Sequence, residues 1–234
     1  MLIKKLLLPA LLSIAFAAST HAETVAIDTS LNPLQAGTDN QGWWSSTITN
    51  SNSSNDNYFT GDNDTFRSFF SFDLSNLSGT FKSATFQVRR YDQPTALTLG
   101  LFEVSTPAST LITTRTNIQD AAIFADLGSG DSYGSFTVAP GSSNDVLSFT
   151  LNEAALSRIN AAVGSGYFSI GAAVIGPGII FSGSTYEPGN FGLGYTQRLV
   201  LDTTQVPEPS HMALVGVGLL VAANAARRKG VKTN

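Results

Sequence analysis

Three acidic residues in one short stretch have the composition of a candidate calcium site. Asp56, Asp62 and Asp64 lie before an aromatic run that starts at Phe66, and Asn63 adds another side-chain oxygen. Hard cations such as Ca²⁺ bind oxygen ligands from carboxylates, amides and backbone carbonyls. The spacing is not that of an EF-hand loop, which a glutamate closes. Because Asp and Asn are also ordinary turn residues, the alternative is a solvated loop without metal.

Two adjacent tryptophans, followed by a tyrosine, could provide rings that stack on a sugar. Trp43 and Trp44 precede a stretch rich in Asn and Ser that ends at Tyr58. Adjacent residues of a strand point to opposite faces, so we expect at most one of the two tryptophans in a core. The other could bind a ligand. The alternative is that both pack against the edge of a sheet, with each indole N–H bonded locally.

The remaining charged residues predict no particular reaction. Arg67 and Asp73 belong to one predicted strand, and we expect them to form surface contacts that contribute little stability. Glycoside hydrolysis needs a pair of carboxylates, but no spacing in the chain singles out a pair. A glycoside-active enzyme is therefore the least expected of the functions considered.

The composition excludes several classes of chemistry. The chain has 234 residues and no cysteine, and its two histidines, His21 and His211, lie near its ends. Between residues 23 and 206 there are therefore no Ser-His-Asp triads, Cys-His dyads or histidine-ligated metals. The same segment holds sixteen acidic and seven basic residues, a net charge of −9. Because phosphate contacts need clustered Lys or Arg, we expect no nucleic-acid partner.

The elements that must position these residues are predicted to be short strands. Apolar and polar residues alternate with a period of two, and Gly, Ser, Asn, Asp and Pro fill the gaps; the runs are 70–74, 84–89, 97–101, 136–138, 147–151, 168–172 and 199–201. This pattern predicts an all-β, antiparallel, jelly-roll-like β-sandwich over residues 23–205. Its predicted core comprises Phe70, Phe72, Leu74, Phe86, Val88, Leu99, Phe149 and Ile170.

One segment has the period of a helix instead. Leu156, Ile159 and Val163 recur at spacings of three and four, Asn152 can cap the start, and Gly164 can end the element. The spacing predicts one short helix over residues 153–163, packed over an open end of the sandwich.

Residues 1–22 have the features of a secretory signal peptide. Lys4 and Lys5 precede an apolar stretch, and Ala22 follows a small residue two positions earlier, which predicts cleavage after Ala22 by signal peptidase. Ala17 and Ala18 are alternative cleavage sites. A retained transmembrane helix is the competing interpretation, but the stretch is short for a bilayer.

The C-terminal segment combines a proline motif, an apolar stretch and a basic cluster. The motif is Val206, Pro207, Glu208 and Pro209, and the two prolines keep the chain extended. Residues 210–226 are mostly apolar and predict a membrane helix. The cluster Arg227, Arg228 and Lys229 then predicts a stop on the cytoplasmic side, before a tail at 230–234.

This tripartite pattern, covering residues 206–229, resembles the PEP-CTERM sorting signal of Gram-negative bacteria. The resemblance implies export, transient anchoring in the inner membrane, and cleavage near the motif by an exosortase. The product would then reach the cell surface or the extracellular matrix.

The body also carries a resemblance, over about 25 residues. The segment 67–75, Arg-Ser-Phe-Phe-Ser-Phe-Asp-Leu-Ser, and the segment 83–86, Ser-Ala-Thr-Phe, are similar to a strand pair of exported bacterial β-sandwich proteins. Related jelly-roll modules occur beside polysaccharide-active domains, and the resemblance therefore implies a carbohydrate ligand. We therefore expect a non-catalytic surface or matrix protein associated with exopolysaccharide, and a carbohydrate-binding module is the alternative.

Overall fold

The computed structural model describes residues 23–36, 38–47, 58–90, 92–113, 120–142, 145–183 and 197–203. The compact unit runs from Glu23 to Thr204. The predicted signal peptide with Ala22, the predicted sorting segment 206–229 and the tail lie outside the described residues, and so does Asp56. Within the described part, no helix has the length and apolar character needed to cross a membrane.

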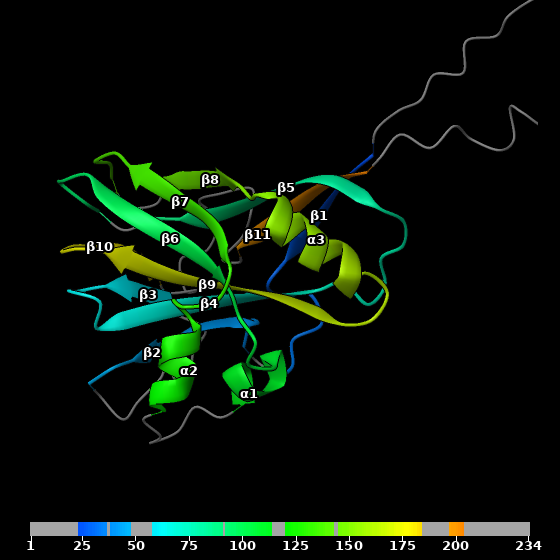
Figure 1. The fold of residues 1–234 in the computed structure, drawn as a ribbon, viewed down its shortest axis with the longest axis horizontal. Helices are drawn as coiled ribbons and strands as arrows, with labels where there is room; N and C mark the ends of the chain where they lie inside the picture. The colour runs from blue at the N-terminus through cyan, green and yellow to red at the C-terminus, as the bar shows by residue number, and fades with distance from the viewer. Residues whose placement is uncertain are drawn as a thin grey trace, which may run out of the picture. The chain divides into compact units, whose positions relative to one another are not determined.

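The fold consists of two antiparallel sheets (Figure 1). The four-stranded sheet has the order β1 (Thr24–Asp28), β11 (Arg198–Thr203), β5 (Phe81–Arg89) and β8 (Val146–Thr150). The seven-stranded sheet has the order β10 (Ile179–Gly183), β3 (Tyr58–Gly61), β4 (Phe66–Asp73), β9 (Tyr167–Ile175), β6 (Leu97–Glu103) and β7 (Ser132–Val138), and β2 (Gln41–Ser45) also pairs with β4. The prediction of an antiparallel, mainly β protein is confirmed.

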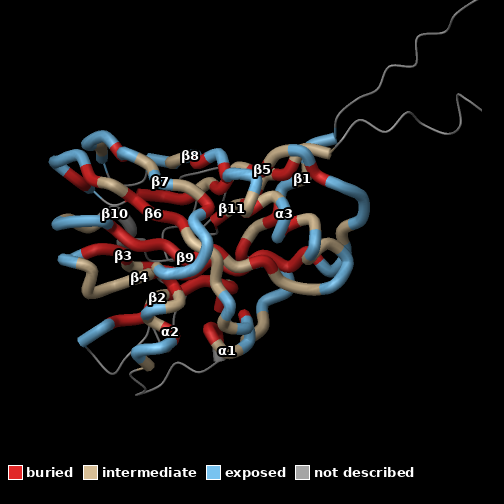
Figure 2. The backbone as a smooth tube through the Cα atoms, viewed as in Figure 1, coloured by how far each residue is buried: buried red, intermediate tan, exposed pale blue. Residues whose placement is uncertain are grey.

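The main core lies between the two sheets, as the buried segments in Figure 2 show. All eight residues predicted for it are buried. Phe72 of β4 and Phe86 of β5 meet edge to face across the core, with ring centroids 6.1 Å apart. Period-two alternation produces this result, because every second side chain of a strand points to the same face.

A second, smaller core lies on the outer face of the seven-stranded sheet, where two short helices pack. They are α1 (Ala108–Thr113) and α2 (Ala121–Asp126), and they cover Trp44 and Phe69. The prediction of a single helix is wrong here. Each of these helices has only six residues, too few for a helical period to stand out in the sequence.

The predicted helix at 153–163 is present as α3, Glu153–Ala162. The side chain of Asn152 accepts a hydrogen bond from the backbone N–H of Ala155, the contact expected of an N-cap. Asn160 bonds both the N–H and the carbonyl of Phe81 at the start of β5. These bonds, together with the buried Ile159, hold the helix against one end of the sandwich.

Candidate functional site

The two tryptophans of the predicted ligand site point to opposite faces of β2. Trp44 is 1% exposed and packs with Phe69 and the two short helices. Trp43 is partly exposed. The prediction that at most one of them is a core residue is therefore confirmed. The prediction that Trp44 contacts a ligand is wrong, because α1 and α2 cover its ring.

Tyr58 is also buried and cannot form part of a surface platform. It is 3% exposed, and its ring lies 5.5 Å from that of Phe70 in the main core. Burial raises the pKa of the Tyr58 hydroxyl, although the positive charge of Arg89 and a hydrogen bond with Gln197 act in the opposite direction. The prediction that Tyr58 is a ligand residue is therefore wrong. Tyr58 is a packing residue at the start of β3.

Trp43 instead belongs to a row of three partly exposed rings on neighbouring strands, which we call the aromatic row: Trp43, Phe66 and Phe59. Phe66 meets Trp43 edge to face at 5.3 Å and Phe59 edge to face at 4.5 Å, measured between ring centroids. Edge-to-face contacts of this kind hold rings in a defined orientation. The row therefore presents a preorganised aromatic surface at the end of the seven-stranded sheet where β2, β3 and β4 meet.

The turn between β3 and β4 lies next to this row and contains two of the predicted calcium ligands. Asp62, Asn63 and Asp64 all have left-handed backbone conformations, with φ of 55°, 56° and 59°. Asn and Asp tolerate this conformation better than most residues, because their short polar side chains bond locally. Turn geometry thus accounts for their presence, and Asp62 and Asn63 are exposed at its tip.

The predicted calcium site is not formed by the described residues. Both carboxylate oxygens of Asp64 are engaged by Arg67, with Oδ1 2.9 Å from Nε and Oδ2 2.7 Å from an Nη atom. The guanidinium therefore supplies the positive charge that a metal ion would have supplied. No group of three or more His, Cys, Asp or Glu side chains converges within the described part of the chain.

Arg67 is a structural residue that joins the sheet to the outer helices. Its Nη1 donates to the carbonyls of Phe124 and Ala125 at the end of α2, at 3.1 and 3.2 Å. Its guanidinium carbon also lies 4.3 Å from the centre of the Phe124 ring. A cation at a helix C-terminus is favourable because the last carbonyls carry partial negative charge. The expectation of a mere surface contact for Arg67 is thus wrong. Its side chain is half-buried and links β4 to the end of α2.

Asp73, the other charged residue of this strand, is 6% exposed. It accepts hydrogen bonds from the side chain of Asn32 at 2.6 Å and from the backbone N–H of Ser75 at 2.9 Å. Burial alone would raise the pKa of its carboxyl, but these bonds outweigh burial and hold the pKa below its ordinary value. The carboxylate is therefore kept charged to bind the loop after β1.

Asp126 has a similar role at the end of α2. It accepts hydrogen bonds from the backbone N–H and hydroxyl groups of Ser105 and Thr106, at 2.6–3.2 Å. Burial favours the neutral form, yet the bonds from Thr106 and Ser105 dominate and lower the pKa of Asp126. Its carboxylate fixes the segment between β6 and α1 and is not available as a general acid at neutral pH.

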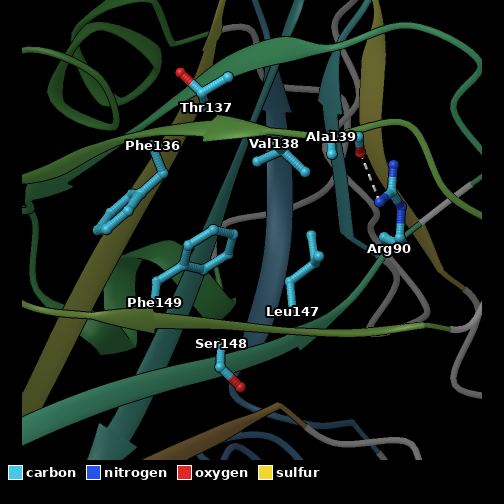
Figure 3. Close-up of a pocket in the computed structure, with 8 residues that line it drawn as sticks. All are labelled: Arg90, Phe136, Thr137, Val138, Ala139, Leu147, Ser148 and Phe149. Carbon is cyan, nitrogen blue, oxygen red and sulfur yellow. Dashed lines mark hydrogen bonds between the residues drawn. The ribbon is translucent and has the colours of Figure 1, made fainter.

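A groove of about 280 Å³ opens between β7 and β8, the last strands of the two sheets on one flank. Figure 3 shows Phe136, Val138, Leu147 and Phe149 pointing into it, whereas Thr137 and Ser148 point away. Arg90 lies at one end, where its guanidinium donates to the carbonyl of Ala139 at 2.9 Å.

Sequence reasoning missed this groove. It identified the runs 136–138 and 147–151 as strands, but alternation does not reveal that both are edge strands on the same flank. The rings of Phe136 and Phe149, 4.8 Å apart, extend the main core to this opening.

Comparison with protein-family models gives no match for the chain, and comparison with curated proteins gives none either. The fold and the two surface features therefore define a class only: a two-sheet antiparallel β protein with an aromatic row at one end and an open groove on one flank.

Proposed function

We propose that this chain is a non-catalytic protein that is exported and sorted by an exosortase to the cell surface or extracellular matrix. Residues 1–22 are cleaved by signal peptidase, and residues 206–229 anchor the chain in the inner membrane until they are removed. The finer fold assignment, a jelly-roll-like sandwich between two terminal helices, belongs to the same proposal. It is supported by the two antiparallel sheets and by the pairing of β1 with β11.

The observation that carries the non-catalytic part is the use of the carboxylates. Eight described acidic side chains bind donors that hold the fold together. They are Asp28 with Arg198, Asp64 with Arg67, Glu103 with Arg158, Asp73 with Asn32, Asp120 with the start of α2, Asp126 with Thr106, Asp145 with Ser142, and Asp202 with Ser83. A carboxylate bound in this way is held in one orientation by the protein, and this suits a scaffold better than proton transfer.

Processing at both ends is the direct test of the sorting proposal. In a Gram-negative host with an exosortase, mass spectrometry of the exported protein should show a chain that begins near Glu23 and ends between Val206 and Pro209. Deleting the exosortase should leave the C-terminal segment attached and the protein in the membrane fraction. Recovery of an extracellular protein that still contains Arg227–Lys229 would contradict the proposal.

A second function, binding of a neutral polysaccharide, is favoured by the aromatic row. Sugar rings have apolar faces that stack on aromatic side chains, and their hydroxyls bond to exposed Asp and Asn such as Asp62 and Asn63. The net charge of −9 between residues 23 and 206 disfavours anionic glycans, because like charges slow encounter. A neutral ligand needs no calcium ion to bridge it to acidic side chains. Arg67 already binds the carboxylate of Asp64.

Replacing Trp43 with alanine should abolish measurable binding to the exopolysaccharide of the producing organism, because the row loses its largest ring. Isothermal titration with the purified polysaccharide measures the effect. Phe102→Ala is the matched control, since Phe102 is a partly exposed ring on β6, separated from β4 by β9. Equal binding by the two variants would show that Trp43 only packs against Phe66.

A further inference from the structure

The strand β8 is an unprotected edge of the four-stranded sheet. It pairs with β5 on one side and is the last strand in the order on the other. Edge strands normally carry charges, prolines or bulges that prevent pairing with another chain. The sequence of β8, Val-Leu-Ser-Phe-Thr, contains none of these, and Val146 is 36% exposed.

Two other edge strands, β1 and β7, are better protected. The strand β1 contains a charged residue, Asp28, which pairs with Arg198. On β7, the carbonyls of Ser132 and Tyr133 already accept hydrogen bonds from Asn152, and the register with β6 shifts at Leu101/Phe102. Of these three strands, β8 is the one whose own residues include neither a charge nor an irregular backbone pairing.

The sequence of β8 is complementary to itself. Antiparallel pairing of two copies centred on Ser148 places Val146 opposite Thr150 on the outer face, twice, with the two serines facing each other on the axis. On the inner face it places Leu147 opposite Phe149, also twice. Directly opposed side chains on adjacent antiparallel strands lie close enough to pack against each other, and such cross-strand pairs stabilise a sheet. The two-fold arrangement is that of most homodimers, in which both copies use the same surface.

The groove on the same flank gives this pairing an apolar component. Leu147 and Phe149 of β8 line it together with Phe136 and Val138 of β7 (Figure 3). When a second copy extends the sheet past β8, its own Leu147 and Phe149 lie beside this opening. The net charge of −9 opposes close approach elsewhere on the surface, whereas β8 itself is uncharged.

We propose that two copies of this chain associate through antiparallel pairing of their β8 strands, forming one continuous eight-stranded sheet. The inference does not rest on the sorting proposal or on a glycan ligand. It can be tested on residues 23–204, because this segment is one compact unit that contains both cores and pairs its first strand with its last.

A single introduced cysteine tests the register. The chain has no cysteine of its own, so Ser148→Cys creates the only thiol. Two thiols at the symmetry axis lie opposite each other at a separation that a disulfide can bridge. Mild oxidation should therefore give a covalent dimer on a non-reducing gel. Ala26→Cys, an exposed position on the opposite edge strand β1, is the control and should stay mainly monomeric. Equal cross-linking of the two variants would overturn the proposal.

A charge at the same position tests the association itself. Light scattering on residues 23–204 should give twice the monomer mass, and Ser148→Lys should give the monomer mass, because two lysines would face each other on the axis. Ala26→Lys should keep the dimer. Ser148 is exposed, so circular dichroism should show an intact fold in both variants. A wild-type monomer at all concentrations, or a dimer that persists in Ser148→Lys, would show that β8 is not the interface.

Discussion

Replacing Phe72 with alanine should lower the free energy of unfolding by about 3–5 kcal/mol. Its side chain is fully buried between the sheets, and its ring meets that of Phe86 at 6.1 Å. Removing the ring loses its transfer free energy and leaves a cavity, because the neighbouring strands are hydrogen-bonded and relax only in part. Denaturant unfolding followed by circular dichroism measures the difference.

Phe102→Ala serves as the comparison for this prediction, since Phe102 is a partly exposed phenylalanine of the same sheet. Phe102→Ala should lower the free energy of unfolding clearly less than Phe72→Ala does. Folding buries less apolar surface of Phe102 than of Phe72. A cost below about 1 kcal/mol for Phe72→Ala would place that residue outside the core and contradict the register of β4.

Replacing Trp44 with alanine should also cost about 3–5 kcal/mol of folding free energy, whereas Trp43→Ala should cost much less. Trp44 fills the second core between β4 and the helices α1 and α2, and Trp43 lies partly in solvent. Because the two residues are adjacent in β2, the comparison tests directly which face of the strand is covered. Equal losses for both would mean that the helices do not seal the outer face.

A third variant separates the ring from its polar group. The indole N–H of Trp44 is buried and has no hydrogen-bond partner among the described residues. Trp44→Phe removes this donor and keeps most of the ring, so its cost should be far below that of Trp44→Ala. A loss as large as that of the alanine variant would show that the indole N–H is bonded in solution.

The local pattern of the sequence was sufficient for the main core and for one helix. Alternation identifies the buried side of each strand, and this is why Phe70, Phe86 and Ile170 could be placed. The capping residue Asn152 and a three-to-four spacing likewise predict α3. These features depend only on contacts within one element, so they can be predicted from neighbouring residues alone.

Only the tertiary structure decided which of these residues remain accessible. Trp43 and Trp44 are equivalent in sequence, but a helical segment more than sixty residues later covers Trp44 alone. Asp64 resembles a metal ligand until the turn brings it against Arg67. β8 is an edge strand because, among the described strands, only β5 pairs with it. Each of these outcomes is set by contacts between distant segments, and no local period in the sequence encodes such contacts.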